Sequence, residues 1–173
     1  MAHCHALRPL TLFSRQFSRL SLFAFFIALI VAIQPGVTQA QTDTWTNAGT
    51  GSWFTPGNWS LDAVPTAAID AAVDNGGTAQ VIGQDATVGN LTIGATTAGS
   101  TVEVTSGRTL TITALTIGPA GTLISDPGSV FTQSGGFVNN GNLVVTAGTF
   151  NSAPITGNGT VTKNDATGLS MWR

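Results

Sequence analysis

The chain has 173 residues, enough for one domain of ordinary size; 8% of them are charged, and the formal net charge is -2. Half of the basic residues, both histidines and the single cysteine lie in the first 20 positions, so residues 41–173 carry three basic and eight acidic side chains, with no Cys, His or Tyr. This composition excludes thiol and histidine nucleophiles, disulfides, His/Cys metal sites and a basic nucleic-acid surface from residues 41–173. We therefore expect no cofactor and no nucleic-acid partner.

The amino-terminal segment has the order of charges and apolar residues that is typical of a secretory signal peptide. Residues 1–19 hold three arginines and no acid, and residues 20–33 form an apolar run. Small and polar residues follow up to Ala40. The run of fourteen is shorter than the roughly 18 residues that a membrane span needs, which favours a cleaved signal over a retained anchor. We predict a signal peptide over 1–40, cleaved between Ala40 and Gln41.

Three tryptophans follow within a short stretch, and we assign residues 41–68 to an amino-terminal cap. Trp45, Trp53 and Trp59 have two interpretations. Aromatic faces on a β-scaffold could stack on sugar rings, which makes the three tryptophans candidate carbohydrate contacts. The favoured interpretation is that they cover the open end of a β-structured core, whose strand edges would otherwise pair with other chains.

Residues 69–168 alternate apolar residues with threonine in short runs separated by Gly, Asn, Asp, Pro and Ser. Thr, Val and Ile together make up about a third of positions 41–173, which is β-branched enrichment of the kind that strands favour. Alternation with period two predicts strands. The predicted strands include Leu91–Ile93, Val102–Val104, Leu110–Ile112, Leu115–Ile117, Leu143–Val145 and Thr160–Thr162.

An internal repeat favours a solenoid over other all-β folds. The segment 88–94 matches the segment 112–118, and Asn142–Val145 is interpreted as a later continuation of the same repeat. In a β-solenoid, each coil adds strands to the coil before it, and stacked coils share one core. The alternative is a β-sandwich, in which Asn-Gly pairs such as Asn140-Gly141 would close hairpins. We predict a parallel β-helix.

The order of residues also resembles a known family. Trp45, Gly51-Ser52-Trp53, Asn58-Trp59, Val64-Pro65 and Ile69-Asp70-Ala71 look like the opening of autotransporter-type passenger domains of bacteria. Gly157–Asp165 is similar to the start of the passenger-associated strand repeat. The resemblance covers most of residues 44–168. It implies a right-handed parallel β-helix with a tryptophan-bearing amino-terminal cap.

One feature departs from that family. An autotransporter carries a carboxyl-terminal membrane barrel, and no run of amphipathic strands of about ten residues follows in this sequence. We therefore expect the amino-terminal part of a passenger, apparently truncated, with coils over 69–168 and a truncated tail over 169–173. The open last coil is expected to self-associate.

The acidic residues are candidates for two kinds of site. A carboxylate pair could hydrolyse glycosidic bonds, and an exposed row of aspartates could bind Ca²⁺. The acids are scattered beside turn residues, and no Gly-Gly-x-Gly-x-Asp repeat is present. We interpret four of them as turn residues that bond local backbone amides, and predict no catalytic and no metal site. These four are Asp70, Asp74, Asp85 and Asp126.

These observations together predict a non-enzymatic protein exported by the general secretory route to the periplasm, the cell surface or the medium. It would serve as an adhesive or structural scaffold, with surface glycans or the surface of a host or neighbouring cell as partners. Its relation to membranes would be limited to the export signal. A polysaccharide-binding or polysaccharide-cleaving secreted β-helix is one alternative, and a nonfunctional truncated gene product is another.

Overall fold

A computed structural model describes residues 40–97 and 99–164 of the chain; the predicted signal segment up to residue 39 and the predicted tail 169–173 lie outside these residues. Ala40–Arg173 forms one compact unit. Its described part is all-β, with one short 3-10 turn, η1 (Pro56–Asn58). Every pairing between the named strands is parallel.

The strands belong to two sheets. The six-stranded sheet contains β2 (Thr50–Ser52), β4 (Thr78–Val81), β6 (Ser100–Val104), β8 (Gly121–Ser125), β11 (Asn142–Val145) and β14 (Thr160–Lys163). The eight-stranded sheet contains β1 (Thr42–Thr44), β3 (Asp70–Val73), β5 (Ala86–Ile93), β7 (Thr109–Ile117), β9 (Val130–Gln133), β10 (Phe137–Asn139), β12 (Thr149–Asn151) and β13 (Ile155–Thr156).

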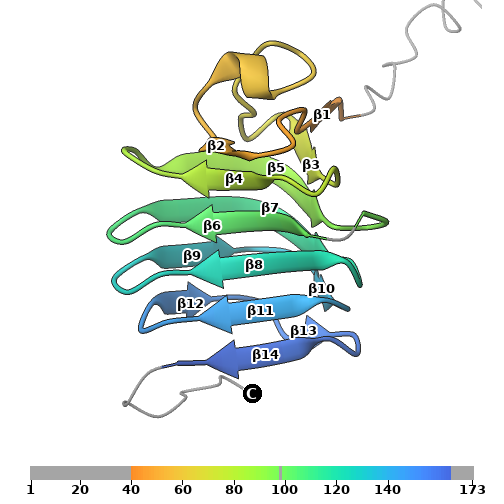
Figure 1. The fold of residues 1–173 in the computed structure, drawn as a ribbon. Coiled ribbons are helices and arrows are strands. Elements are labelled where there is room, and N and C mark those ends of the chain that lie inside the picture. The colour runs from red at the N-terminus through yellow and green to blue at the C-terminus, as the bar shows by residue number, and fades with distance from the viewer. Residues whose placement is uncertain (1–39, 98, 165–173) are drawn as a thin grey trace, which may run out of the picture. The chain divides into compact units, whose positions relative to one another are not determined.

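The chain winds between these sheets as a β-solenoid. Each strand pairs with the equivalent strand of the next coil, as β4 does with β6 and β6 with β8. In Figure 1 the strands nearest the viewer run from right to left and each coil lies below the one before, so the coil is right-handed. The predicted right-handed parallel β-helix is confirmed. The β-sandwich alternative is wrong, because Asn140-Gly141 joins β10 to β11 at a corner and closes no hairpin.

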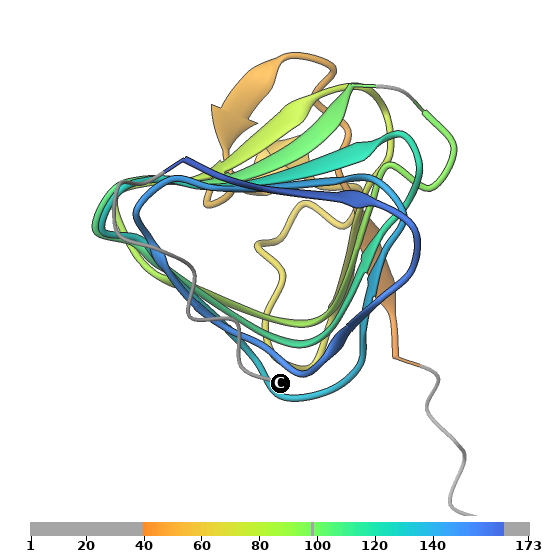
Figure 2. The same cartoon turned by 90° about the horizontal axis from the view of Figure 1, so that it is seen from below.

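Each coil has three sides, because the long strands β5 and β7 turn a corner. Their pairing runs from Ala86 to Val88 and resumes at Asn90, so Gly89 stands at the corner of β5. In the next coil the two halves are separate strands, and both β9 and β10 pair with β7. Seen along the solenoid axis in Figure 2, the coils superpose as a three-sided loop.

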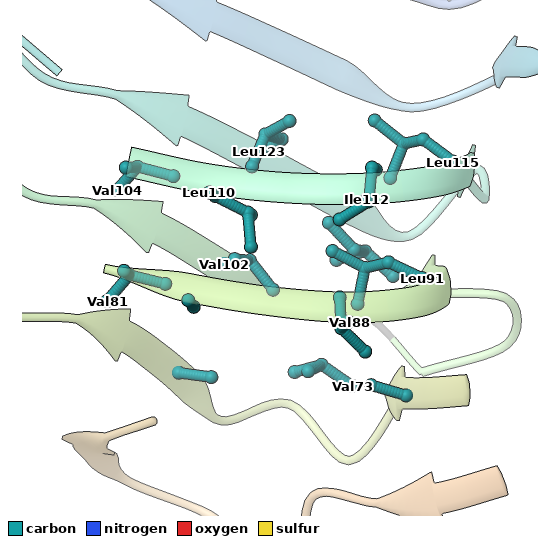
Figure 3. Close-up of a cluster of buried hydrophobic side chains, with 14 of the residues drawn as sticks. Val73, Val81, Val88, Leu91, Val102, Val104, Leu110, Ile112, Leu115 and Leu123 are labelled. Atoms are coloured by element: carbon teal, nitrogen blue, oxygen red, sulfur yellow. The ribbon is translucent and has the colours of Figure 1, made fainter. Parts of the chain in front are cut away.

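The core consists of inward side chains that stack from coil to coil. The predicted match between segments 88–94 and 112–118 is confirmed in register, because Leu91 pairs with Leu115. Its predicted continuation is wrong: Phe137 lies next to Leu115, whereas Leu143 pairs with Leu123 in the other sheet. Buried stacks of this kind fill the interior, as Figure 3 shows. Each buried large aliphatic side chain contributes roughly 1.5–3 kcal/mol relative to an exposed one.

The corners between the six-stranded sheet and the β5–β7 side repeat a left-handed backbone conformation. Gly83, Gly107 and Gly128 have φ values of 81°, 73° and 74°. Ala147, which lies at the equivalent corner between β11 and β12, has a φ of 52°. Glycine adopts this conformation without the steric cost that a Cβ brings. The chain thus turns the same corner repeatedly by the same device, with one alanine in place of glycine.

Candidate functional surface

The three tryptophans that the sequence marks as candidate sugar contacts lie together at the amino-terminal end of the solenoid. Trp45, Trp53 and Trp59 are 0–1% exposed. Trp59 meets Trp45 and Trp53 edge to face, with ring centroids 5.0 and 4.7 Å apart. They form the top layer of the core. A sugar could reach these rings only if the cap opened.

A buried carboxylate ties the cap loop to the first strand. Asp43 on β1 is 1% exposed, and its Oδ1 accepts hydrogen bonds from the Ser60 hydroxyl and the Leu61 backbone N–H, each at 3.0 Å. β1 and β2 also pair in parallel with β3 and β4, so the segment predicted as a cap supplies the first strand of each sheet. The predicted cleavage residues, Ala40 and Gln41, are both exposed just ahead of β1.

The most regular polar surface is the outward face of the six-stranded sheet. The registers of neighbouring strands align one row across all six strands. We call this row, which comprises Thr50, Thr78, Thr101, Thr122, Asn142 and Thr160, the threonine row. Neighbouring strands are about 4.8 Å apart, so the row is about 24 Å long.

Most hydroxyls of the threonine row have no partner within the described chain. Thr101 donates to the Gly99 carbonyl oxygen at 3.2 Å. The side chains of the other threonines in the row make no hydrogen bond in the part of the chain that the structure describes. β-Branched side chains are stiff at χ1, so these hydroxyls keep their positions. The surface presents donors and acceptors at fixed intervals.

The second outward row of the same sheet is mixed. It contains Ser52, Gln80, Glu103, Ile124, Val144 and Thr162. The Gln80 side-chain amide donates to the Glu103 carboxylate at 2.7 Å. Glu103 is the single charged residue in the two rows, so a partner would meet this face mainly through hydroxyl, amide and aliphatic groups.

Three of the four aspartates predicted to bond local amides bond the next coil instead. Asp70 accepts from the backbone N–H of Asn90 at 2.8 Å, and Asp85 accepts from that of Thr109 at 2.9 Å. Asp74 accepts from the backbone N–H groups of Thr96 and Thr97 at 2.9 and 2.8 Å. The prediction of amide partners was right but their location was wrong, because a solenoid brings residues from successive coils into contact.

The fourth aspartate, Asp126, lies two residues beyond Ile124, the strand partner of Glu103. Burial and the negative charge of Glu103 raise the pKa of Asp126 above its ordinary value. Glu103 is on β6, and Asp126 follows β8, which pairs with β6. This carboxylate pair was not predicted from the sequence, because its members belong to different coils and only the strand register brings them together.

Among residues 40–97 and 99–164, no group of three or more His, Cys, Asp or Glu side chains could hold a metal ion. The same residues include no helix that is long and apolar enough to cross a membrane. Comparison with known proteins found no matching family model, no matching curated protein and no matching solved structure.

Proposed function

We propose that this protein is an exported, passenger-like β-solenoid that serves as an adhesive or structural scaffold. The threonine row is the observation that carries the proposal. It places unpaired hydroxyls at regular intervals on a rigid sheet, where they can bond a partner without first being ordered. A single hydroxyl contact is weak, but a row of them binds a repetitive partner with far higher avidity.

The chemistry of this face favours a polar, uncharged and repetitive partner, such as the glycans of a cell surface. Glu103 is the one charge on the two outward rows of the sheet. No aromatic residue belongs to either row, so binding would depend on hydrogen bonds and not on ring stacking. Such contacts are weak singly, which suits reversible adhesion.

Export is tested by expressing the full chain in a bacterial host and fractionating the cells. We expect the protein in the periplasm, at the surface or in the medium, with Gln41 as its amino-terminal residue. A product retained in the cytoplasm with its leader intact would contradict the exported function.

Adhesion is tested by measuring the attachment of protein-coated beads to bacterial cells. Replacing Thr78, Thr101 and Thr122 together by alanine should reduce attachment at least tenfold. The matched control replaces three threonines that form a row in the other sheet, on β5, β7 and β9, and this variant should keep attachment. These residues are Thr87, Thr111 and Thr132. Equal loss in both variants, or loss in neither, would contradict the assignment of the threonine row.

A second candidate function is cleavage of a polysaccharide by Glu103 and Asp126, which the register of β6 and β8 places on neighbouring coils. Glycoside hydrolysis uses two carboxyl groups, one protonated and one ionised, and the raised pKa of Asp126 is in the direction that an acid requires. The test is hydrolysis of a panel of soluble and insoluble polysaccharides, with E103Q and D126N as variants. Activity that either variant abolishes would replace the scaffold function by an enzymatic one.

A further inference from the structure

The two ends of the solenoid differ in how their core is covered. At the amino-terminal end the buried tryptophans of the cap form the last layer. At the other end, Ile155 and Val161 are 38% and 41% exposed. Their strand partners one coil earlier, Phe137 and Leu143, are each 1% exposed. The core stacks therefore reach the last described coil, and their side chains are exposed there.

The open end also presents strand edges without a partner in the described residues. β12, β13 and β14 each pair on one side only, with β9, β10 and β11. Unpaired backbone N–H and C=O groups beside exposed apolar side chains are a template for a further strand.

We propose that the open end binds the open end of a second copy of this chain, forming an end-to-end dimer. Head-to-tail stacking would require exposed strand edges at the amino-terminal end as well, but the cap covers that end. Two identical open ends meet through a two-fold axis, which is a closed interface and stops at two chains. To bury Val161 of one chain against Val161 of the other, the two-fold axis must pass through β14 at this residue. The two β14 strands then pair antiparallel.

Charge does not oppose this arrangement. Lys163 is the one charged residue between positions 127 and 164. With the axis at Val161, the two Lys163 residues lie four positions apart along the paired strands, about 14 Å. That exceeds the Debye length of about 8 Å at physiological ionic strength, so the repulsion between them is largely screened.

The dimer would extend the adhesive surface. A two-fold axis perpendicular to the β14 side joins two six-stranded sheets edge to edge and leaves both outward faces on the same side. Two threonine rows then face one partner surface. Once the first row has bound, binding of the second row is an intramolecular step, which raises the avidity. This inference goes beyond the scaffold function and does not depend on the threonine row as a binding site.

Sedimentation velocity of the unit Ala40–Arg173 over a range of concentrations tests the proposal. We expect a monomer–dimer equilibrium without larger species. Val161→Lys should weaken dimerisation at least tenfold. The control is Ile82→Lys, because Ile82 is 47% exposed but lies between β4 and β5, away from the open end. A monomer at every concentration, open-ended polymers, or equal effects of the two lysines would overturn the proposal.

Cross-linking gives an independent test that does not depend on binding strength. Residues 40–173 contain no cysteine. Opposite residues of an antiparallel pair have Cα atoms about 4.5–5.5 Å apart, within the range that a disulfide bridges. Val161→Cys should therefore form a covalent dimer under mild oxidation, whereas Ile82→Cys should not. Equal cross-linking of both variants, or of neither, would contradict the two-fold arrangement.

Discussion

Trp59 donates its indole N–H to the backbone carbonyl oxygen of Trp53 at 2.7 Å, inside a layer of rings from which water is excluded. Trp45 and Trp53 share this layer, but their indole nitrogens have no hydrogen-bond partner in the structure. The three tryptophans are equally buried, but only the Trp59 indole N–H makes a hydrogen bond. The contribution of this hydrogen bond to the free energy of unfolding can be measured.

Replacing Trp59 by phenylalanine should lower the free energy of unfolding by more than the same change at Trp45. Both variants lose similar ring volume, but only Trp59→Phe leaves the Trp53 carbonyl oxygen buried without a donor, at a cost of about 1–3 kcal/mol. Urea unfolding of the two variants gives the difference. Equal destabilisation by the two substitutions would show that this hydrogen bond does not stabilise the cap.

Replacing Ala147 by glycine should raise the free energy of unfolding by about 1 kcal/mol. Ala147 has a φ of 52°, in the left-handed region where a Cβ is strained and where three other coils use glycine. The converse change, Gly107→Ala, should destabilise by a similar amount, because a Cβ there would have nothing within 4 Å and only the φ of 73° opposes it. Thermal unfolding measures both, and a destabilised Ala147→Gly variant would contradict the argument.

Replacing Gly141 by alanine should destabilise the last coils by several kcal/mol. A Cβ at Gly141 would collide with the backbone carbonyl oxygens of Gly118 and Gly121, which cannot move without breaking the corner. Gly136 is the matched control, because a Cβ there would meet nothing within 4 Å. Circular dichroism melts should show a large loss for Gly141→Ala and little change for Gly136→Ala. Similar melts would rule out close packing at this corner.

The Asp74 carboxylate should contribute to stability at neutral pH but not in acid. Burial raises the pKa of Asp74, but hydrogen bonds from the Thr97 and Thr96 backbone N–H groups and the Thr96 hydroxyl together lower it by more. A group with a lowered pKa in the folded state contributes fully above its unfolded pKa of about 4, and the contribution is lost as pH falls through the folded pKa.

Asp74→Asn should therefore lower the melting temperature at pH 7, and the difference from the parent should shrink below about pH 4. The effect is small, less than about 1 kcal/mol, because solvent screens this exposed site. Asp62→Asn is the control, since the Asp62 side chain makes no hydrogen bond in the described residues. A difference that persists unchanged at pH 3 would contradict ionisation as its cause.

The predicted repeat shows how far sequence reasoning reached. Leu91 and Leu115 were correctly matched because their segments repeat in step, with each residue beside its equivalent one coil later. The next coil is shorter, so the step from Leu115 to Phe137 is smaller than the step from Leu91 to Leu115, and the repeat has no constant length. Leu143 was misplaced because its local pattern resembles that of Leu115, although it lies in the other sheet.

The threonine row could not be predicted from the sequence either, because its coils also differ in length. The spacing between its successive members shrinks at every step, from the interval between Thr50 and Thr78 to that between Asn142 and Thr160, so the row has no fixed period. Threonines are also common throughout the chain, so nothing local distinguishes Thr101 from Thr111. Only the strand registers show which of them stand in line.

In the segments that alternate apolar and polar residues, such as Leu91–Ile93 and Val102–Val104, the sequence by itself determined which residues face inward, because strand alternation follows from the local geometry of the backbone. It also determined that the surface is nearly uncharged and rich in hydroxyl groups, because composition does not depend on the fold. The tertiary structure alone decided which strand lies beside which. Strand neighbours depend on loop lengths and on the packing of a shared core, and both are properties of the whole coil and not of any segment in it.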